Sequence, residues 1–193
     1  MLSLTDHVLS AESYTVRLFL ALLHLPYNKI AADAYPGGEI VPVLRDGQTV
    51  LRDPGLILAH LSRSYDSAGS WLPAADAADV ARWLAIAATD LAVLSEARRV
   101  AVLGAKGNLA VLNQKGRAAL RTLDDHLAMR RLKGKDWMVG DGPTIADLAV
   151  FPHVMLSHDS GLGHEDYPAI NLWQRRLRRL DGFTGMPGIP DYF

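Results

Sequence analysis

The sequence predicts an α/β domain followed by an all-α domain. Short apolar runs with the character of strands alternate with helical patterns before residue 65. After residue 76 the apolar residues recur at helical spacing, and no strand pattern interrupts them. A stretch of small polar residues lies between the two regions. We therefore expect a first domain over residues 1–65, a linker over 66–75 and an all-helical domain over 76–193.

The first domain should open with a strand, a helix and a second strand. Residues 2–5 form a short apolar run, and residues 27–32 form another. Between them, the stripe of an amphipathic helix consists of Val16, Phe19, Leu20 and Leu23. We expect this helix to begin within residues 10–13 and to end at Pro26. Such an order predicts two parallel strands joined by a crossover helix.

A hairpin and another helix should follow. Two apolar runs, residues 40–44 and 49–51, flank a polar turn. Pro42 cannot donate a hydrogen bond to a strand ladder, so it belongs at a strand edge or in a special turn, a setting compatible with a cis peptide bond. Asp53 is a good N-cap for a helix that continues to Tyr65.

The rest of the chain has the pattern of packed helices. One long apolar stripe consists of Val80, Trp83, Leu84, Ala87, Leu91 and Leu94, and a second consists of Leu109, Leu112, Leu120, Leu123 and Leu127. Thr144 and Asp147 have the spacing of a capping box, with Asp in place of the usual Glu. In the helix that starts there, Leu148, Phe151 and Met155 face one way, so we expect it at the centre of the helical domain.

Composition excludes several kinds of site. The chain has no cysteine, so any thiol chemistry must use a thiol that the substrate brings. The 20 basic residues balance 21 acidic ones, which gives no overall field for nucleic acid or an anionic membrane. The seven histidines include no H-E-x-x-H pattern, and we expect no metal site. With no apolar segment long enough for a bilayer, we expect a cytoplasmic protein.

The ordered set of motifs resembles the glutathione S-transferase family. The motifs are the hairpin opening at residues 41–42, the acidic cap at Asp53, the capping box at 144–147, and a closing helix after residues 167–168 that contains Trp173. They match that family's order over nearly the whole chain. The resemblance implies a thioredoxin-like N-terminal domain, an all-helical C-terminal domain, glutathione as co-substrate and a homodimer.

The resemblance also implies the site residues. Serine-using members place the catalytic hydroxyl six residues before the valine of a Val-Arg pair, and the pair Val16-Arg17 selects Ser10. A serine hydroxyl and the positive end of a helix would favour the thiolate of glutathione, because a free thiol has a pKa of about 8.5. Val41 would offer its backbone to the cysteinyl part, Pro42 would fix the bend, and Asp53 would hold the γ-glutamyl ammonium.

Each candidate also has a purely structural interpretation. Ser10 is a preferred helix cap, and Ser13 competes for that position. Tyr14 is a second candidate for a hydroxyl near the sulfur. Val41 could simply open a hairpin, and Asp53 could simply cap its helix.

Two departures from the family pattern leave the function open. Pro54 replaces a serine that would hold the γ-glutamyl carboxylate, and proline has neither the hydroxyl nor the N–H. Residues 33–40 replace a helix that the family usually has. We therefore expect a glutathione transferase acting on a small electrophile. The alternatives are a non-enzymatic binding or scaffold protein that has lost glutathione binding, and an enzyme that uses another thiol or acid in the same cleft.

Overall fold

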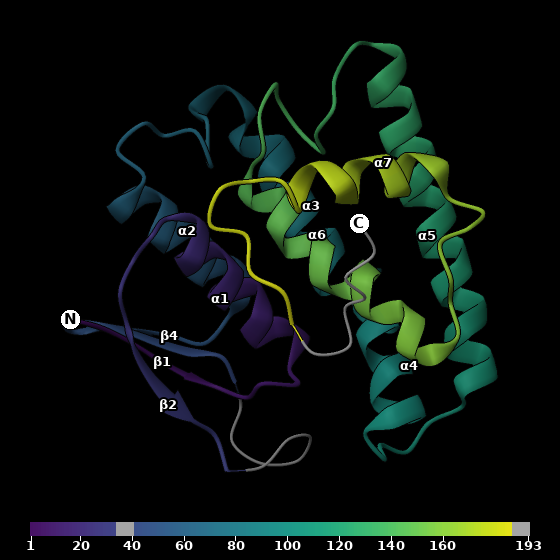
Figure 1. Ribbon diagram of the computed structural model, residues 1–193, viewed down its shortest axis with the longest axis horizontal. Helices are drawn as coiled ribbons and strands as arrows, with labels where there is room; N and C mark the ends of the chain where they lie inside the picture. Colours follow the sequence, from purple (N-terminus) through teal and green to yellow (C-terminus); the bar gives the residue numbers. More distant parts are fainter. Residues whose placement is uncertain (34–40, 187–193) are drawn as a thin grey trace.

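The computed structural model describes residues 1–33 and 41–186, and it combines a small sheet with a larger set of helices (Figure 1). The strands are β1 (Leu2–Asp6), β2 (Asn28–Ala31), β3 (Val43–Asp46) and β4 (Thr49–Leu51). The α-helices are α1 (Ala11–Leu22), α2 (Pro54–Tyr65), α3 (Ala77–Ala88), α4 (Ala92–Val102), α5 (Leu109–Leu132), α6 (Ile145–Met155) and α7 (Pro168–Leu177). Two 3₁₀ helices, η1 (Ala74–Asp76) and η2 (Leu156–Ser160), complete the order. The predicted α/β part followed by a helical part is confirmed.

The sheet has the order β2-β1-β3-β4. Strands β1 and β2 are parallel, with Thr5 opposite Ile30, and this confirms the predicted crossover through α1. Strand β3 is antiparallel to both β1 and β4. Helices α1 and α2 lie between this sheet and the other helices, and both contact α6 (Figure 1). The starts of α1 and α2 therefore lie against the helical part of the chain.

The predicted first strand of the hairpin was placed too early in the chain. Residue 40 lies outside the described residues, and β3 begins at Val43. Arg45 and Asp46, which we expected in the turn, belong to the strand because they pair with β1 on one side and β4 on the other. The turn is a two-residue loop in which Gly47 has a φ of 57°, a conformation that glycine adopts without steric cost.

Helix α1 ends before the predicted stop at Pro26. It begins at Ala11, as expected, but its last helical residue is Leu22. His24 adopts a left-handed φ of 52°, and its N–H donates to the carbonyl of Ala21, while the next N–H, of Leu25, donates to the carbonyl of Leu20. These two bonds form a Schellman motif, which closes a helix without proline.

The first long apolar stripe of the C-terminal part is two helices, not one. Helix α3 ends at Ala88 and α4 begins at Ala92. The hydroxyl of Thr89 donates to the carbonyl of Ala85, and the N–H of Leu91 bonds back to the carbonyl of Ile86. Such side-chain bonds to the backbone compete with helix continuation. The second stripe is one helix, α5, as predicted.

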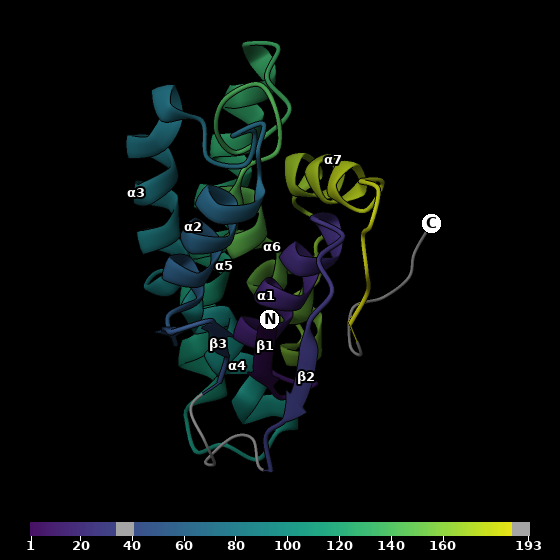
Figure 2. The ribbon, with the colours of Figure 1, turned by 90° about the vertical axis from the view of Figure 1, so that its left-hand side faces the viewer.

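Helix α6 is the centre of the helical part. Every residue of α6 is buried, and α3 and α7 lie on opposite sides of it (Figure 2). The predicted capping box is present: Asp147 Oδ2 accepts the N–H of Thr144 at 2.9 Å. Asp147 also accepts the indole N–H of Trp173 on α7 at 2.8 Å, so one carboxylate fixes the start of α6 and the position of α7.

Candidate functional site

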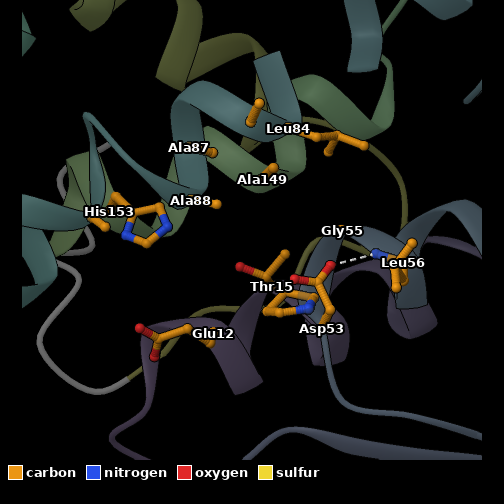
Figure 3. A pocket seen from close by; sticks show the side chains of 13 residues that line it. Glu12, Thr15, Asp53, Gly55, Leu56, Leu84, Ala87, Ala88, Ala149 and His153 are labelled. Carbon is orange, nitrogen blue, oxygen red and sulfur yellow. Dashed lines mark hydrogen bonds between the residues drawn. The ribbon is translucent and has the colours of Figure 1, made fainter. Parts of the chain in front are cut away.

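A cavity of about 400 Å³ lies between the sheet-bearing part and the helical part. The starts of α1 and α2 form one wall, and α3, the start of α4 and α6 form the other (Figure 3). Its lining residues are Glu12, Thr15, Asp53, Pro54, Gly55, Leu56, Leu84, Ala85, Ala87, Ala88, Ala92, Ala149 and His153. Because several of the helical residues are alanines, the two walls do not close on each other.

The end of the cavity that Glu12 and His153 form is its polar end. Toward the other end lie Leu56 and Leu84, together with Asp53, whose carboxylate accepts the N–H of Leu56 (Figure 3). The wall between them is largely made of small apolar side chains, such as Ala88 on α3. The space therefore suits a small apolar molecule that carries one polar group.

Ser10 is the N-cap of α1. Its Oγ accepts the N–H of Ser13 at 3.1 Å and donates to Glu12 Oε2 at 2.9 Å. The residue is fully buried and does not line the cavity. The structural interpretation of Ser10 as a cap is therefore confirmed. Tyr14, the second hydroxyl candidate, is also buried, and its hydroxyl donates to the carbonyl of Thr184 at 2.6 Å.

Val41 and Pro42 lie beside the segment that carries Ser10. The peptide bond between them is cis, and Pro42 directly precedes β3. Since Val43 pairs with Thr5 near the end of β1, the two residues before β3 adjoin the start of the loop that leads to Ser10. Neither residue lines the cavity.

Asp53 does line the cavity, at the start of α2. Its Oδ1 accepts the N–H of Leu56 at 2.8 Å, so the predicted cap is confirmed. Pro54 and Gly55 follow it along the same wall, and both line the cavity. The side chain of Pro54 thus leaves the cavity accessible, although it supplies no N–H there.

Glu12 is a site residue that the sequence interpretation missed. Its side chain is 26% exposed and lies 3.5 Å from Arg99 Nη1. Burial alone would raise the pKa of the Glu12 carboxyl, but His153, the Ser10 hydroxyl and Arg99 together lower the pKa below its ordinary value. The carboxyl is therefore ionised at neutral pH, and it holds the Ser10 hydroxyl.

His153 is the second missed residue. Its Nδ1 lies 2.7 Å from Ser95 Oγ, and both side chains are buried. Burial lowers the pKa of the His153 imidazole, although Glu12 opposes the shift. The ring is therefore neutral at pH 7. His158, five residues further along the chain, bonds to His164 instead.

The loop before α1 is fixed from the helical part. Arg98 on α4 donates through Nη1 to the carbonyl of Leu9 at 2.6 Å and through Nε to Asp159 at 2.7 Å. Arg17 on α1 donates to Asp6 at 2.7 Å and to the carbonyls of His7 and Val8. These bonds hold the segment that leads into Ser10 on both sides.

The part of the chain that the structure describes has neither a metal-binding cluster nor a membrane-spanning helix. Within residues 1–33 and 41–186, His, Asp and Glu form no cluster of three that could bind a metal ion. In the same residues, no helix is both long and apolar enough to cross a membrane.

The chain matches known proteins over most of its length. Residues 77–176 match the family model described as glutathione S-transferase, C-terminal domain. Over 150 residues, the chain is 28% identical to glutathione S-transferase verG of Clonostachys rogersoniana, a match that covers 72% of this chain and 62% of that relative. The chain therefore spans less than two thirds of that relative's length.

Solved structures agree with this match. A glutathione S-transferase from Xanthobacter autotrophicus superposes with a TM-score of 0.83 at 24% identity, covering 97% of this chain and 98% of the other. A glutathione transferase homologue from Lodderomyces elongisporus, solved with two glutathione molecules per subunit, superposes with a TM-score of 0.82 at 18% identity and covers 94% of each chain. At these identities the superpositions show the fold, which confirms the predicted thioredoxin-like and helical architecture.

Proposed function

Because the chain belongs to the glutathione S-transferase family, we propose that it binds glutathione and transfers the thiol to a small electrophile. The observation that carries the proposal is the cavity, which joins the starts of α1 and α2 to the apolar wall of α3 and α6. A thiol held at the first wall would meet an electrophile held at the second. The glutathione in the Lodderomyces elongisporus homologue supports the same ligand here.

Glutathione would lie along the segment before β3 and reach the start of α2. The backbone N–H and C=O of Val41 would pair with the cysteinyl part, because Val41 lies just before β3 and outside its ladder. The Asp53 carboxylate lines the cavity and would bind the γ-glutamyl ammonium. Pro54 leaves the γ-glutamyl carboxylate with fewer donors, so we expect modest affinity.

Ser10 would donate its hydroxyl to the sulfur. Its Oγ already stands at the N-terminus of α1, where the helix dipole favours an anion. The hydroxyl donates to Glu12, so it would have to turn from the carboxylate to the thiolate when glutathione binds. The thiolate would then attack the electrophile, and the sulfur would form the new bond.

A non-enzymatic binding or scaffold protein is the alternative. Two observations favour it: the Ser10 hydroxyl is buried and bonded to Glu12, and Pro54 lacks the donors for a carboxylate. Such a protein would keep the fold but would not bind glutathione.

We extend the proposal to the oligomeric state and the cellular location of the protein. We propose a homodimer in the cytoplasm, and membership of the family is what supports it. Sedimentation equilibrium of the purified protein would give twice the 21.0 kDa chain mass if the dimer forms, and the chain mass if it does not.

Turnover tests the enzymatic proposal directly. The purified protein should accelerate consumption of benzyl chloride and of a small enone by reduced glutathione, with saturation in both substrates. Rates equal to those of the uncatalysed mixtures would instead favour the scaffold protein.

A further inference from the structure

His153 occupies a distinct position in the cavity. It is a buried imidazole, 7% exposed, at the polar end of a space that is otherwise mostly apolar. Figure 3 shows its ring directed into the cavity from α6, close to Glu12 on α1. Within the described residues its one hydrogen bond joins Nδ1 to Ser95 Oγ. The other ring nitrogen, Nε2, therefore has the cavity available to it.

The bond to Ser95 determines which nitrogen carries the proton. Ser95 is buried on α4, and among the described residues its hydroxyl bonds to His153 Nδ1, at 2.7 Å. A buried hydroxyl requires an acceptor, and a lone pair on Nδ1 supplies one. Donation from Ser95 to Nδ1 places the imidazole hydrogen on Nε2. The cavity thus contains a fixed, neutral N–H donor at its polar end.

We propose that His153 donates this N–H to an oxygen of the bound electrophile, and that the preferred substrates are small apolar compounds with a carbonyl conjugated to a carbon–carbon double bond. The substrate class rests on the proposed function, whereas the donor role rests on the geometry alone. A carbonyl oxygen satisfies the donor, and the remaining hydrocarbon fills the alanine-lined space.

The chemical step needs no group beyond those already described. The glutathione thiolate forms a bond to the β-carbon, the electrons of the C=C bond move toward the carbonyl, and negative charge collects on its oxygen. The His153 N–H stabilises that oxyanion by a hydrogen bond and keeps its proton. The enolate carbon then takes a proton from water, which replaces the proton lost when the thiol ionised.

Binding without glutathione tests the donor role by itself. Acetophenone and its hydrocarbon counterpart, α-methylstyrene, have nearly the same shape, and both can be titrated against the protein by nuclear magnetic resonance. We expect the ketone to bind about tenfold more tightly, the effect of one hydrogen bond in a buried site. His153→Phe should abolish the difference, and His153→Gln, which keeps an N–H donor, should restore part of it.

The exposed His24 provides the control, because His24→Asn removes an imidazole that does not line the cavity. That variant should retain the full preference for the ketone. Equal binding of the two compounds to the unaltered protein, no binding of either, or an unchanged preference in His153→Phe would overturn the donor role.

Turnover then tests the substrate class. With glutathione present, His153→Phe should lose at least about tenfold more kcat/KM on a small enone than on benzyl chloride, because only the enone collects charge on an oxygen. Equal losses on the two substrates would overturn the substrate class. If the unaltered protein turns over neither compound, the proposed function fails, and the ketone titration still decides the donor role.

Discussion

The guanidinium of Arg98 on α4 donates to the carbonyl oxygen of Leu9 at 2.6 Å, and Leu9 directly precedes the helix cap Ser10. Arg98 is 3% exposed and also pairs with Asp159, so the helical part of the chain holds the segment in front of α1 through one buried charge. The position of Ser10 relative to the cavity therefore depends on a residue far away in the sequence.

Removal of the Arg98 charge should destabilise the protein. Arg98→Met leaves Asp159 and the carbonyl of Leu9 without their donor, and breaking a buried pair in this way costs about 3 kcal/mol. The free energy of unfolding from urea titration measures the loss. The exposed Arg63 on α2 is the matched control, and Arg63→Met should change stability by less than about 0.5 kcal/mol. A similar small effect for both variants would show that the bond to Leu9 carries little energy.

Substitutions at Ser10 separate capping from catalysis. Ser10→Gly keeps most of the cap stability, at a cost of a few tenths of a kcal/mol, but removes the hydroxyl. We expect it to lower kcat/KM for thiol transfer by about 100-fold, because the thiolate loses its donor. Ser10→Thr keeps the hydroxyl and should keep far more activity. If Ser10→Gly turned over substrate as fast as the unaltered protein, Ser10 would be a cap alone.

Neutralising Glu12 should make bound glutathione more acidic. The Glu12 carboxylate is ionised, accepts the Ser10 hydroxyl and lies near the start of α1, so its charge opposes a thiolate there. Glu12→Gln removes the charge while Arg99 remains. We expect the pKa of the bound thiol, followed by thiolate absorbance, to fall. A higher or unchanged pKa would mean that Glu12 does not act on the sulfur.

Acid should weaken the fold through His164. The pKa of His164 is lowered to about 4, mainly by burial and in addition by the neighbouring His158. In the unfolded chain, the pKa of a histidine is about 6.5. Between these values the unfolded chain binds more protons than the folded chain, so stability falls as pH falls through this window. The shift corresponds to about 3 kcal/mol. In urea titrations from pH 7 to pH 4, His164→Asn should lose less stability than the unaltered protein. An identical slope in the two proteins would exclude His164 as the cause.

Local sequence was enough to predict the elements that position the site. Asp53 caps α2, and Thr144 and Asp147 form the capping box of α6, because a cap depends on residues within one turn of each other. The division of the chain at residues 66–75 stays a prediction. In the structure, the segment from Asp66 to Pro73 joins α2 to η1 without a helix or strand of its own.

The polar end of the cavity could not be predicted in the same way. Ser95 and His153 lie 58 positions apart, and they meet only because α4 packs beside α6. Glu12 has the position of an ordinary acidic residue in the first turn of a helix, and the sequence does not show that its carboxylate accepts the Ser10 hydroxyl. The alanines that leave the cavity open look the same in sequence as alanines that pack a core.

Calorimetric titration with reduced glutathione tests most directly whether this family member binds the tripeptide. We expect saturable heat with a dissociation constant at or below the millimolar range. Asp53→Asn, which keeps an equally good helix cap, should weaken binding by roughly tenfold because the bond to the ammonium loses its charge. No heat up to millimolar ligand would contradict glutathione binding and leave the scaffold protein as the function of this fold.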